Sequence, residues 1–123
     1  MKARFLPAIV LSLAGVALSA HAEPAAKMAN GMLVNTSGMT LYTFDRDAAG
    51  SGKSACNGPC ATLWPPVTAT ADAKPEGDLT LLTREDGTKQ WAYKGKPLYQ
   101  YSPDKKAGDK AGDNFKDAWH VVK

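Results

Sequence analysis

The chain has 123 residues, of which 44% are hydrophobic and 8% aromatic, and it carries a formal net charge of +3. This length suits one small domain and leaves no room for a second one. So small a positive excess excludes the nucleic-acid binders, which concentrate many basic residues on one face, and we expect no nucleic-acid partner.

The first 22 residues have the pattern of an export signal. Lys2 and Arg4 precede an apolar segment, residues 5–18, and a small-x-small cleavage site follows at Ala20-His21-Ala22. The apolar segment is shorter than a bilayer span, and no second one follows, so we expect no membrane span in the mature protein. Cleavage would also remove two basic residues, which lowers the net charge to about +1.

The mature chain is expected to begin at Glu23. A lipoprotein needs cysteine at this place, so we expect no lipid anchor and predict a location in the periplasm or outside the cell. Residues 23–30 show no periodicity and are interpreted as a flexible lead-in. Residues 31–123 are predicted to form a single domain.

Residues 38–47 and 95–104 resemble each other and indicate an internal duplication. Glycine, leucine, tyrosine, a second aromatic residue and aspartate recur in the same order and at the same spacing, and a tryptophan follows in each half. The matched residues are Gly38, Leu41, Tyr42, Phe44, Asp47 and Trp64 in the first half, and Gly95, Leu98, Tyr99, Tyr101, Asp104 and Trp119 in the second. We therefore expect two repeats in the domain, repeat 1 at about 31–67 and repeat 2 at about 79–123.

Each repeat is predicted to form a β-hairpin, then a loop, then a segment that carries the tryptophan. The predicted strands are 32–34, 41–44, 79–83, 89–93, 97–101 and 119–122, separated by turn sequences at 35–38, 85–88 and 94–96. The segment that carries Trp64 is expected to be a short helical turn at most, because Pro65 and Pro66 end it. Because no stretch of ten residues has helical periodicity, the fold class is all-β, with two duplicated hairpin-type repeats in one small domain.

Strand geometry places the aromatic residues of each motif on one face. Side chains two positions apart point the same way, so Tyr42 lies beside Phe44 and Tyr99 beside Tyr101, while the leucine of each motif points to the opposite face. Such faces suit either a binding platform for sugar, peptide or haem, or packing between the two repeats. We favour core packing.

The motifs resemble a bacterial family of secreted and lipoprotein-type repeats. Its paired Y-x-[FWY]-x-x-D motifs match Tyr42-x-Phe44-x-x-Asp47 and Tyr99-x-Tyr101-x-x-Asp104. Other family-like segments are Cys56-x-x-x-Cys60-Ala61, Trp64-Pro65-Pro66, Thr83-Arg84-x-Asp86-Gly87 and Trp91-x-Tyr93-x-Gly95-x-Pro97-Leu98-Tyr99. The resemblance covers essentially the whole mature chain and implies a secreted repeat of unknown function. The chain departs from the lipoprotein members in lacking the lipid-accepting cysteine.

Cys56 and Cys60 are the only cysteines, and an exported protein meets an oxidising compartment. The turn-forming Asn57-Gly58-Pro59 between them allows the thiols to approach, so we expect a structural disulfide that closes a short loop. It would stabilise the fold by roughly 2 kcal/mol. A redox-active pair and a metal-binding pair are the alternatives, although thioredoxin-type chemistry uses two intervening residues.

The acidic loops permit a second set of alternatives. Residues 50–54 look like the end of a phosphate-binding loop, but Asp47 stands where that motif requires glycine, so we interpret them as a solvated loop. Asp45-x-Asp47-x-x-Gly50 resembles a calcium loop without its bidentate glutamate. We favour a structural role for Asp47 and Asp104, as acceptors of hydrogen bonds from backbone amides of the turn that ends each strand.

The sequence favours an exported, non-enzymatic envelope protein that binds an envelope protein or a small ligand, or serves a structural role. A single mature histidine gives no catalytic triad, and we predict no catalytic residue, cofactor or metal. The alternative is a periplasmic redox or copper accessory protein, which would use the cysteine pair, His120, Met28, Met32 and Met39.

Overall fold

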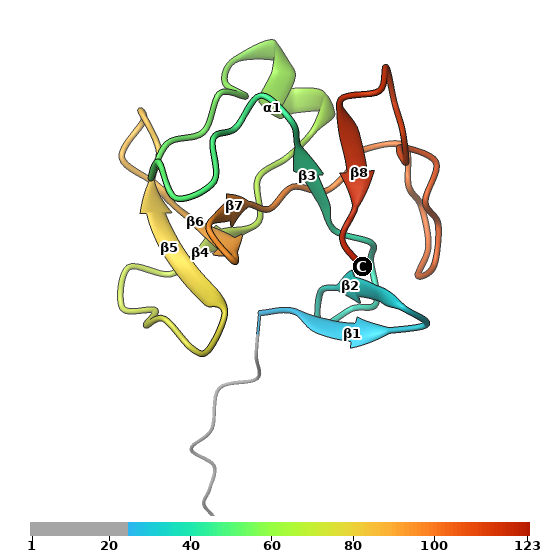
Figure 1. The fold of residues 1–123 in the computed structure, drawn as a ribbon, viewed down its shortest axis with the longest axis horizontal. Helices are drawn as coiled ribbons and strands as arrows, with labels where there is room; N and C mark the ends of the chain where they lie inside the picture. Colours follow the sequence, from blue (N-terminus) through green and yellow to red (C-terminus); the bar gives the residue numbers. More distant parts are fainter. Residues whose placement is uncertain (1–24) are drawn as a thin grey trace, which may run out of the picture.

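Short antiparallel strands joined by turns make up residues 25–123, the part of the chain that the computed structural model describes (Figure 1). The predicted export signal, residues 1–22, lies outside the described residues. None of the helical structure in the described part has the length and apolar character of a membrane span. The elements are β1 (Lys27–Ala29), β2 (Met32–Val34), β3 (Tyr42–Phe44), α1 (Pro59–Leu63), β4 (Thr68–Ala69), β5 (Leu79–Thr83), β6 (Lys89–Tyr93), β7 (Lys96–Pro97) and β8 (Trp119–Val121). The all-β prediction is confirmed.

The described part of the segment interpreted as a flexible lead-in, residues 25–30, is ordered instead, because β1 pairs antiparallel with β2 from Lys27 opposite Val34 to Ala29 opposite Met32. Asn30 and Gly31 connect the strands with φ values of 52° and 80°. Asn-Gly is the dipeptide that a tight hairpin turn with two positive φ values favours. A three-residue strand is too short to show periodicity, so the sequence signal for this hairpin is the Asn30-Gly31 turn.

Repeat 2 builds its sheet around β6, which pairs with β4 and β5 and also with β7. The predicted Asp-Gly turn joins β5 to β6, where Gly87 has a φ of 89°. Lys94 and Gly95 form the turn from β6 to β7, again with positive φ values of 51° and 85°. Strands 79–83 and 89–93 were predicted with these bounds.

The strand predicted over 97–101 is shorter in the structure. β7 ends at Pro97, and the chain then leaves β6 for the other repeat, where Tyr99 forms an isolated bridge with Tyr42. Two backbone hydrogen bonds hold this bridge, Tyr42 N to Tyr99 O at 2.8 Å and Tyr99 N to Tyr42 O at 2.9 Å. Corresponding tyrosines of the two repeats thus meet at the centre of the molecule. β3 and β8 add a second junction between the first and last parts of the domain (Figure 1).

Two buried clusters lie on opposite faces of this central bridge. One is largely aromatic and contains Tyr42, Tyr99, Trp64 and Trp119, together with Met32, Cys56 and Val121. The other is aliphatic and contains Ala26, Leu33, Leu41, Val67, Leu79 and Leu98. Both tyrosines and both leucines of the duplicated motif have no exposed surface. The alternation along each strand therefore buries both faces, as core packing requires.

Candidate functional site

The motif tyrosines and aspartates form hydrogen bonds across the two repeats. Tyr42 Oη donates to Asp104 Oδ2 at 2.7 Å, and Tyr99 Oη donates to Asp47 Oδ2 at 2.6 Å. Each repeat thus supplies the acceptor for the tyrosine of the other. We call these two pairs the cross-braces. All four side chains are buried.

The second oxygen of each aspartate holds a loop. Asp47 Oδ1 accepts a hydrogen bond from Ala55 N at 2.6 Å, and Asp104 Oδ1 accepts one from Ala111 N at 2.9 Å. We predicted donors in the turn that ends each strand, and this prediction is wrong. The two donors lie 8 and 7 residues farther along the chain. The carboxylates point into the core, where they fasten the returning loop.

Burial sets the protonation of the cross-braces. Desolvation, followed by the hydrogen bond to its aspartate, raises the pKa of Tyr42 and of Tyr99 far above the usual value. Burial also raises the pKa of Asp47, although the bonds from Tyr99 and Ala55 and the charge of Arg84 lower it. Both phenols therefore stay protonated at neutral pH and act as donors, which suits a structural role.

The remaining motif aromatics form a continuous stack with two rings from each repeat. Trp64 and Trp119 are parallel with their centroids 3.9 Å apart, while Phe44 stacks on Trp119 at 4.1 Å and Tyr101 on Trp64 at 4.2 Å. The two tryptophans are buried, and the outer rings are half-buried. The ring faces are largely used in packing, so they do not form an open platform for a ligand.

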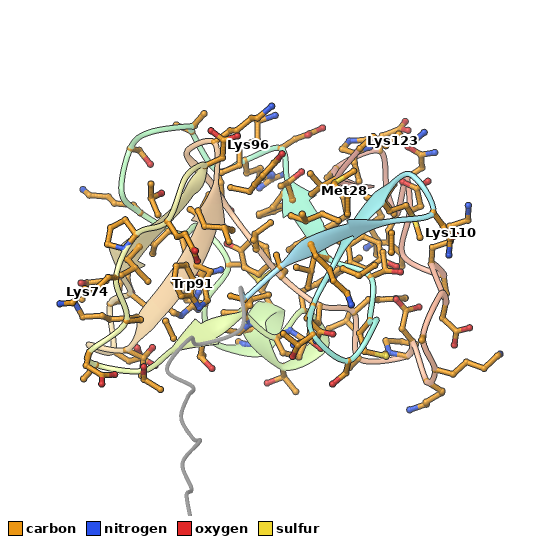
Figure 2. The ribbon with its side chains drawn as sticks, turned by 90° about the horizontal axis from the view of Figure 1, so that it is seen from below. Met28, Lys74, Trp91, Lys96, Lys110 and Lys123 are labelled. Atoms are coloured by element: carbon orange, nitrogen blue, oxygen red, sulfur yellow. A yellow bond between two sulfur atoms is a disulfide. The ribbon has the colours of Figure 1, made fainter. Side chains whose placement is uncertain are left out.

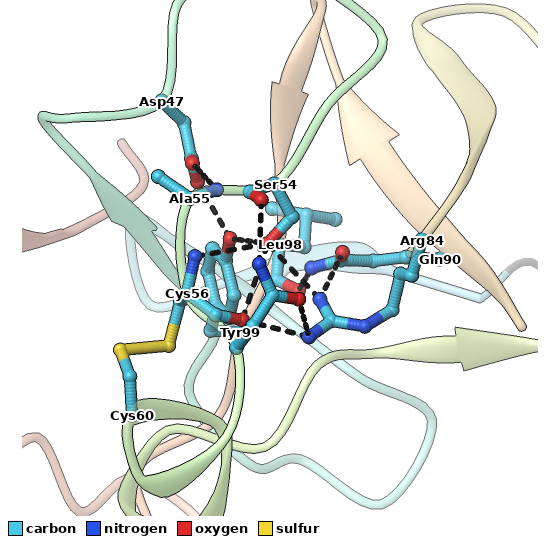
Figure 3. Close-up of a disulfide and its surroundings, with 10 residues drawn as sticks. Asp47, Ser54, Ala55, Cys56, Cys60, Arg84, Gln90, Leu98 and Tyr99 are labelled. Carbon is cyan, nitrogen blue, oxygen red and sulfur yellow. Dashed lines mark hydrogen bonds between the residues drawn. A yellow bond between two sulfur atoms is a disulfide. The ribbon is translucent and has the colours of Figure 1, made fainter. Parts of the chain in front are cut away.

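The predicted disulfide between Cys56 and Cys60 is confirmed, with the two Cα atoms 5.2 Å apart (Figure 3). Beside it lies a buried polar network that the sequence did not predict. Arg84 donates through Nη1 to Gln90 Oε1 and through Nη2 to Cys56 O, each at 2.7 Å. Ser54 Oγ accepts from Arg84 at 3.0 Å and also meets the Tyr99 hydroxyl, which extends the network to one cross-brace. In the sequence, Arg84 stands directly before a tight turn, where side chains are usually solvated. Its position therefore did not indicate burial.

The acidic loops do not gather into a calcium site. Asp45 pairs with His120, Asp109 accepts from backbone amides of its own turn, and Asp113 accepts from Val121 N. Within residues 25–123 no group of three or more histidine, cysteine or acidic side chains is placed to hold a metal ion. Redox and copper roles gain no support, because the cysteines are joined and Met32 is buried in the core.

An open cleft of about 310 Å³ lies where β8 and the end of β3 face the β6–β7 turn. Lys94 and Lys96 enter it from that turn, Asp45 follows β3, and His120 comes from β8. Lys123 also lines it. Figure 2 shows Lys96 and Lys123 along one edge of the molecule, with Lys74 and Lys110 at its opposite ends. The cleft is the candidate functional site, and the sequence did not predict it.

The charge of the cleft is not balanced locally. In the part of the chain that the structure describes, neither Lys94 nor Lys96 takes part in an ion pair, whereas Asp45 is paired with His120 at 2.9 Å. Lys94 Nζ lies 5.4 Å from the centroid of the Tyr93 ring, a cation–π arrangement that keeps the ammonium group beside the cleft. The cleft therefore presents excess positive charge to solvent.

The charged residues of the cleft have no charged counterpart in the other repeat. Aligned by the duplication, Lys94-Gly95-Lys96 corresponds to Ser37-Gly38-Met39, and Asp45 corresponds to Ser102. Scaffold residues such as the tyrosines and aspartates of the cross-braces recur in both repeats, but the charged residues of the cleft do not. A comparison of the two turns in the sequence offered this signal.

Comparisons with known proteins agree with the duplication. Residues 25–68 and 80–123 each match the model of a family described as a secreted repeat of unknown function. The first match begins at residue 25 and so includes the β1–β2 hairpin in repeat 1. No curated protein and no solved structure matches the chain.

Proposed function

Since the chain belongs to this family of secreted repeats, we propose that it works outside the cytoplasm as a non-enzymatic module that binds an anionic ligand in the cleft beside β8. The observation that carries the proposal is the pair Lys94 and Lys96, which bring unbalanced positive charge into a cleft at the junction of the repeats. The ligand is expected to come from the cell envelope.

The scaffold supports binding because it fixes the turn that carries the two lysines. Gly50 N donates to Gly95 O at 2.8 Å, so the loop of repeat 1 rests against this turn. A Cβ on Gly95 would approach Gly50 N to 2.9 Å, which explains glycine at this position beyond its φ of 85°. Residues held in place before binding lose less entropy on binding, and this favours affinity.

Hydrogen bonding around the histidine supports a role without catalysis. His120 Nε2 faces Asp45 Oδ2 at 2.9 Å, and Nδ1 faces Asn114 Oδ1 at 3.1 Å. Both ring nitrogens already have partners, which supports a structural role for the imidazole. The cross-braced tyrosines are buried and protonated, which supports the same conclusion.

The test compares a cleft variant with a variant of equal charge change. Binding of trigalacturonate and of inorganic tripolyphosphate is measured by isothermal titration calorimetry at low and high salt. We expect at least one anion to bind, and the double variant Lys94→Gln/Lys96→Gln to bind it about tenfold or more weakly, because two charged contacts are lost. Lys74→Gln/Lys110→Gln, whose lysines do not line the cleft, should bind like the parent. Absence of binding to both anions, or equal losses in both double variants, would reject the proposal.

A further inference from the structure

We propose that the cleft recognises an acidic saccharide, a sugar ring that carries a carboxylate or a phosphate, and that Asp45 selects the ring through its hydroxyl groups. This inference rests on the proposed function, because it names the class of anion that the cleft would take. It starts from the presence of one acidic side chain, Asp45, in a cleft that three lysines also line.

Asp45 is held in a fixed orientation. Its backbone N–H donates to Ala118 O at 2.8 Å, and its Oδ2 accepts from His120 Nε2 at 2.9 Å. The side chain is exposed, and His120 is the only residue of the described part that hydrogen-bonds to the carboxylate. Asp45 Oδ1 therefore remains available as an acceptor at the wall of the cleft.

A carboxylate and two lysines in one cleft favour a ligand with both hydroxyl donors and an acid. A bare inorganic anion would pair with Lys94 and Lys96 but would be repelled by Asp45. A neutral sugar would donate to Asp45 but would offer the lysines only uncharged hydroxyl acceptors. An acidic sugar can place its acid on the lysines and donate from ring hydroxyls to Asp45, and both of these contacts are charge-assisted hydrogen bonds.

The other walls suit a sugar ring. Val122 and Tyr93, which are both partly buried, also line the cleft, and the C–H face of a pyranose can pack against them. The volume of about 310 Å³ lies at the small end of the range of ligand sites, so we expect roughly one or two sugar rings to be enclosed.

Two matched pairs of ligands test the inference by titration calorimetry. Glucose 6-phosphate is compared with inorganic phosphate, and glucuronate with acetate, so that each pair shares its acid and differs in the sugar. We expect the sugar of at least one pair to bind about tenfold or more tightly than its partner, and glucose itself to bind more weakly than that acidic sugar. The pair that shows the preference identifies the acid as phosphate or carboxylate.

Variants separate the inference from the proposed function. Asp45→Asn should lower the preference for the sugar over its bare acid about tenfold, because the hydroxyl acceptor weakens while the repulsion of small anions disappears. Asp86→Asn, on the exposed β5–β6 turn, should leave the preference unchanged. Equal binding of each sugar and its bare acid, with both lost in Lys94→Gln/Lys96→Gln, would overturn the saccharide and retain the anion site. Absence of binding to all four of these acids would overturn the saccharide, and absence of binding to trigalacturonate and tripolyphosphate as well would overturn both.

Discussion

The loop that follows each motif donates a backbone hydrogen bond to the aspartate of that motif, but the two loops are otherwise stabilised by different interactions. In repeat 1 the loop of residues 48–60 carries the disulfide, and Arg84 bonds to its carbonyl and hydroxyl groups. In repeat 2 the loop of residues 105–118 has Gly112 directly after Ala111, as Cys56 directly follows Ala55, and Phe115 four residues before Trp119, as Cys60 precedes Trp64. The Phe115 ring packs 5.7 Å from the centroids of both Trp64 and Tyr101.

Gly112 shows why the second loop has no disulfide. A Cβ at this position would come within 2.5 Å of the Trp64 ring and 2.9 Å of the Tyr101 ring. The backbone amide of Gly112 instead donates to Tyr42 Oη at 3.2 Å. Repeat 2 thus replaces a covalent link by close aromatic packing. The difference teaches that the duplication preserves the cross-braces, while each repeat stabilises its own loop separately.

The largest difference between the repeats is expected when the acceptors of the cross-braces are removed. Asp104→Ala should lower the free energy of unfolding by about 2 kcal/mol, because it leaves a buried phenol and a loop amide without an acceptor. Asp47→Ala should cost more, about 3 kcal/mol, because the same loss also removes the carboxylate whose charge acts on buried Arg84. Urea unfolding measures both effects.

Glu85→Ala, at an exposed position on the β5–β6 turn, serves as the control for loss of one negative charge. Unchanged stability of both aspartate variants would show that the motif is a surface feature rather than a brace. A larger loss for Asp104→Ala than for Asp47→Ala would show that the Arg84 network does not distinguish the two repeats.

Removal of the covalent link should have the next effect in size. Cys56→Ala/Cys60→Ala is expected to lose roughly 2 kcal/mol of stability, the contribution of a short closed loop. The cross-brace between Tyr99 and Asp47 and the hydrogen bond from Ala55 N to Asp47 remain, so the variant should still fold and bind its anion. Thermal melting under non-reducing conditions measures the loss, and addition of a reductant should change the parent but leave the variant unaffected. A variant that no longer folds would show that the disulfide, rather than the cross-brace, holds this loop.

The sequence predicted what depends on local patterns. The positions of β2, β3, β5, β6 and β8 follow from alternation and turn chemistry, as does the turn at Asp86-Gly87. The disulfide follows from its short spacing, and the burial of both faces beside Tyr42 and Tyr99 follows from alternation. The hydrogen bond between Tyr42 of repeat 1 and Asp104 of repeat 2 could not be predicted, because neither residue indicates which repeat supplies its partner. Burial of Arg84 depends in the same way on contacts with a distant loop.

The cleft could be predicted from the sequence only in part. Its position depends on how β8 lies against the β6–β7 turn, which no local pattern specifies. Its charge, however, was present in the difference between Lys94-Gly95-Lys96 and Ser37-Gly38-Met39. In a duplicated chain, shared residues identify the scaffold, and the places where the copies differ are the better candidates for a binding site.

The smallest expected difference concerns alkaline pH, where the two cross-braces should behave alike. Desolvation and the bond to aspartate raise the pKa of both Tyr42 and Tyr99, while in the unfolded chain a tyrosine titrates near pH 10. Above about pH 10 the unfolded state therefore releases these protons and the folded state keeps them, so stability falls as pH rises. Each tyrosine should contribute a slope of about 1.4 kcal/mol per pH unit in this range, and none below it.

Urea unfolding measured between neutral and alkaline pH tests this equivalence. Tyr42→Phe and Tyr99→Phe should each be less stable than the parent at neutral pH, because each loses a buried hydrogen bond. Each should also lose about half of the alkaline slope that the pair supplies, and the double variant should lose all of it. Tyr93→Phe, whose phenol has no carboxylate partner among the described residues, is the matched control and should keep the parent slope. Unequal slopes in the two single variants would mean that the Ser54 contact makes the cross-brace of Tyr99 differ from that of Tyr42. An unchanged slope in the double variant would mean that neither phenol keeps its proton through the cross-brace.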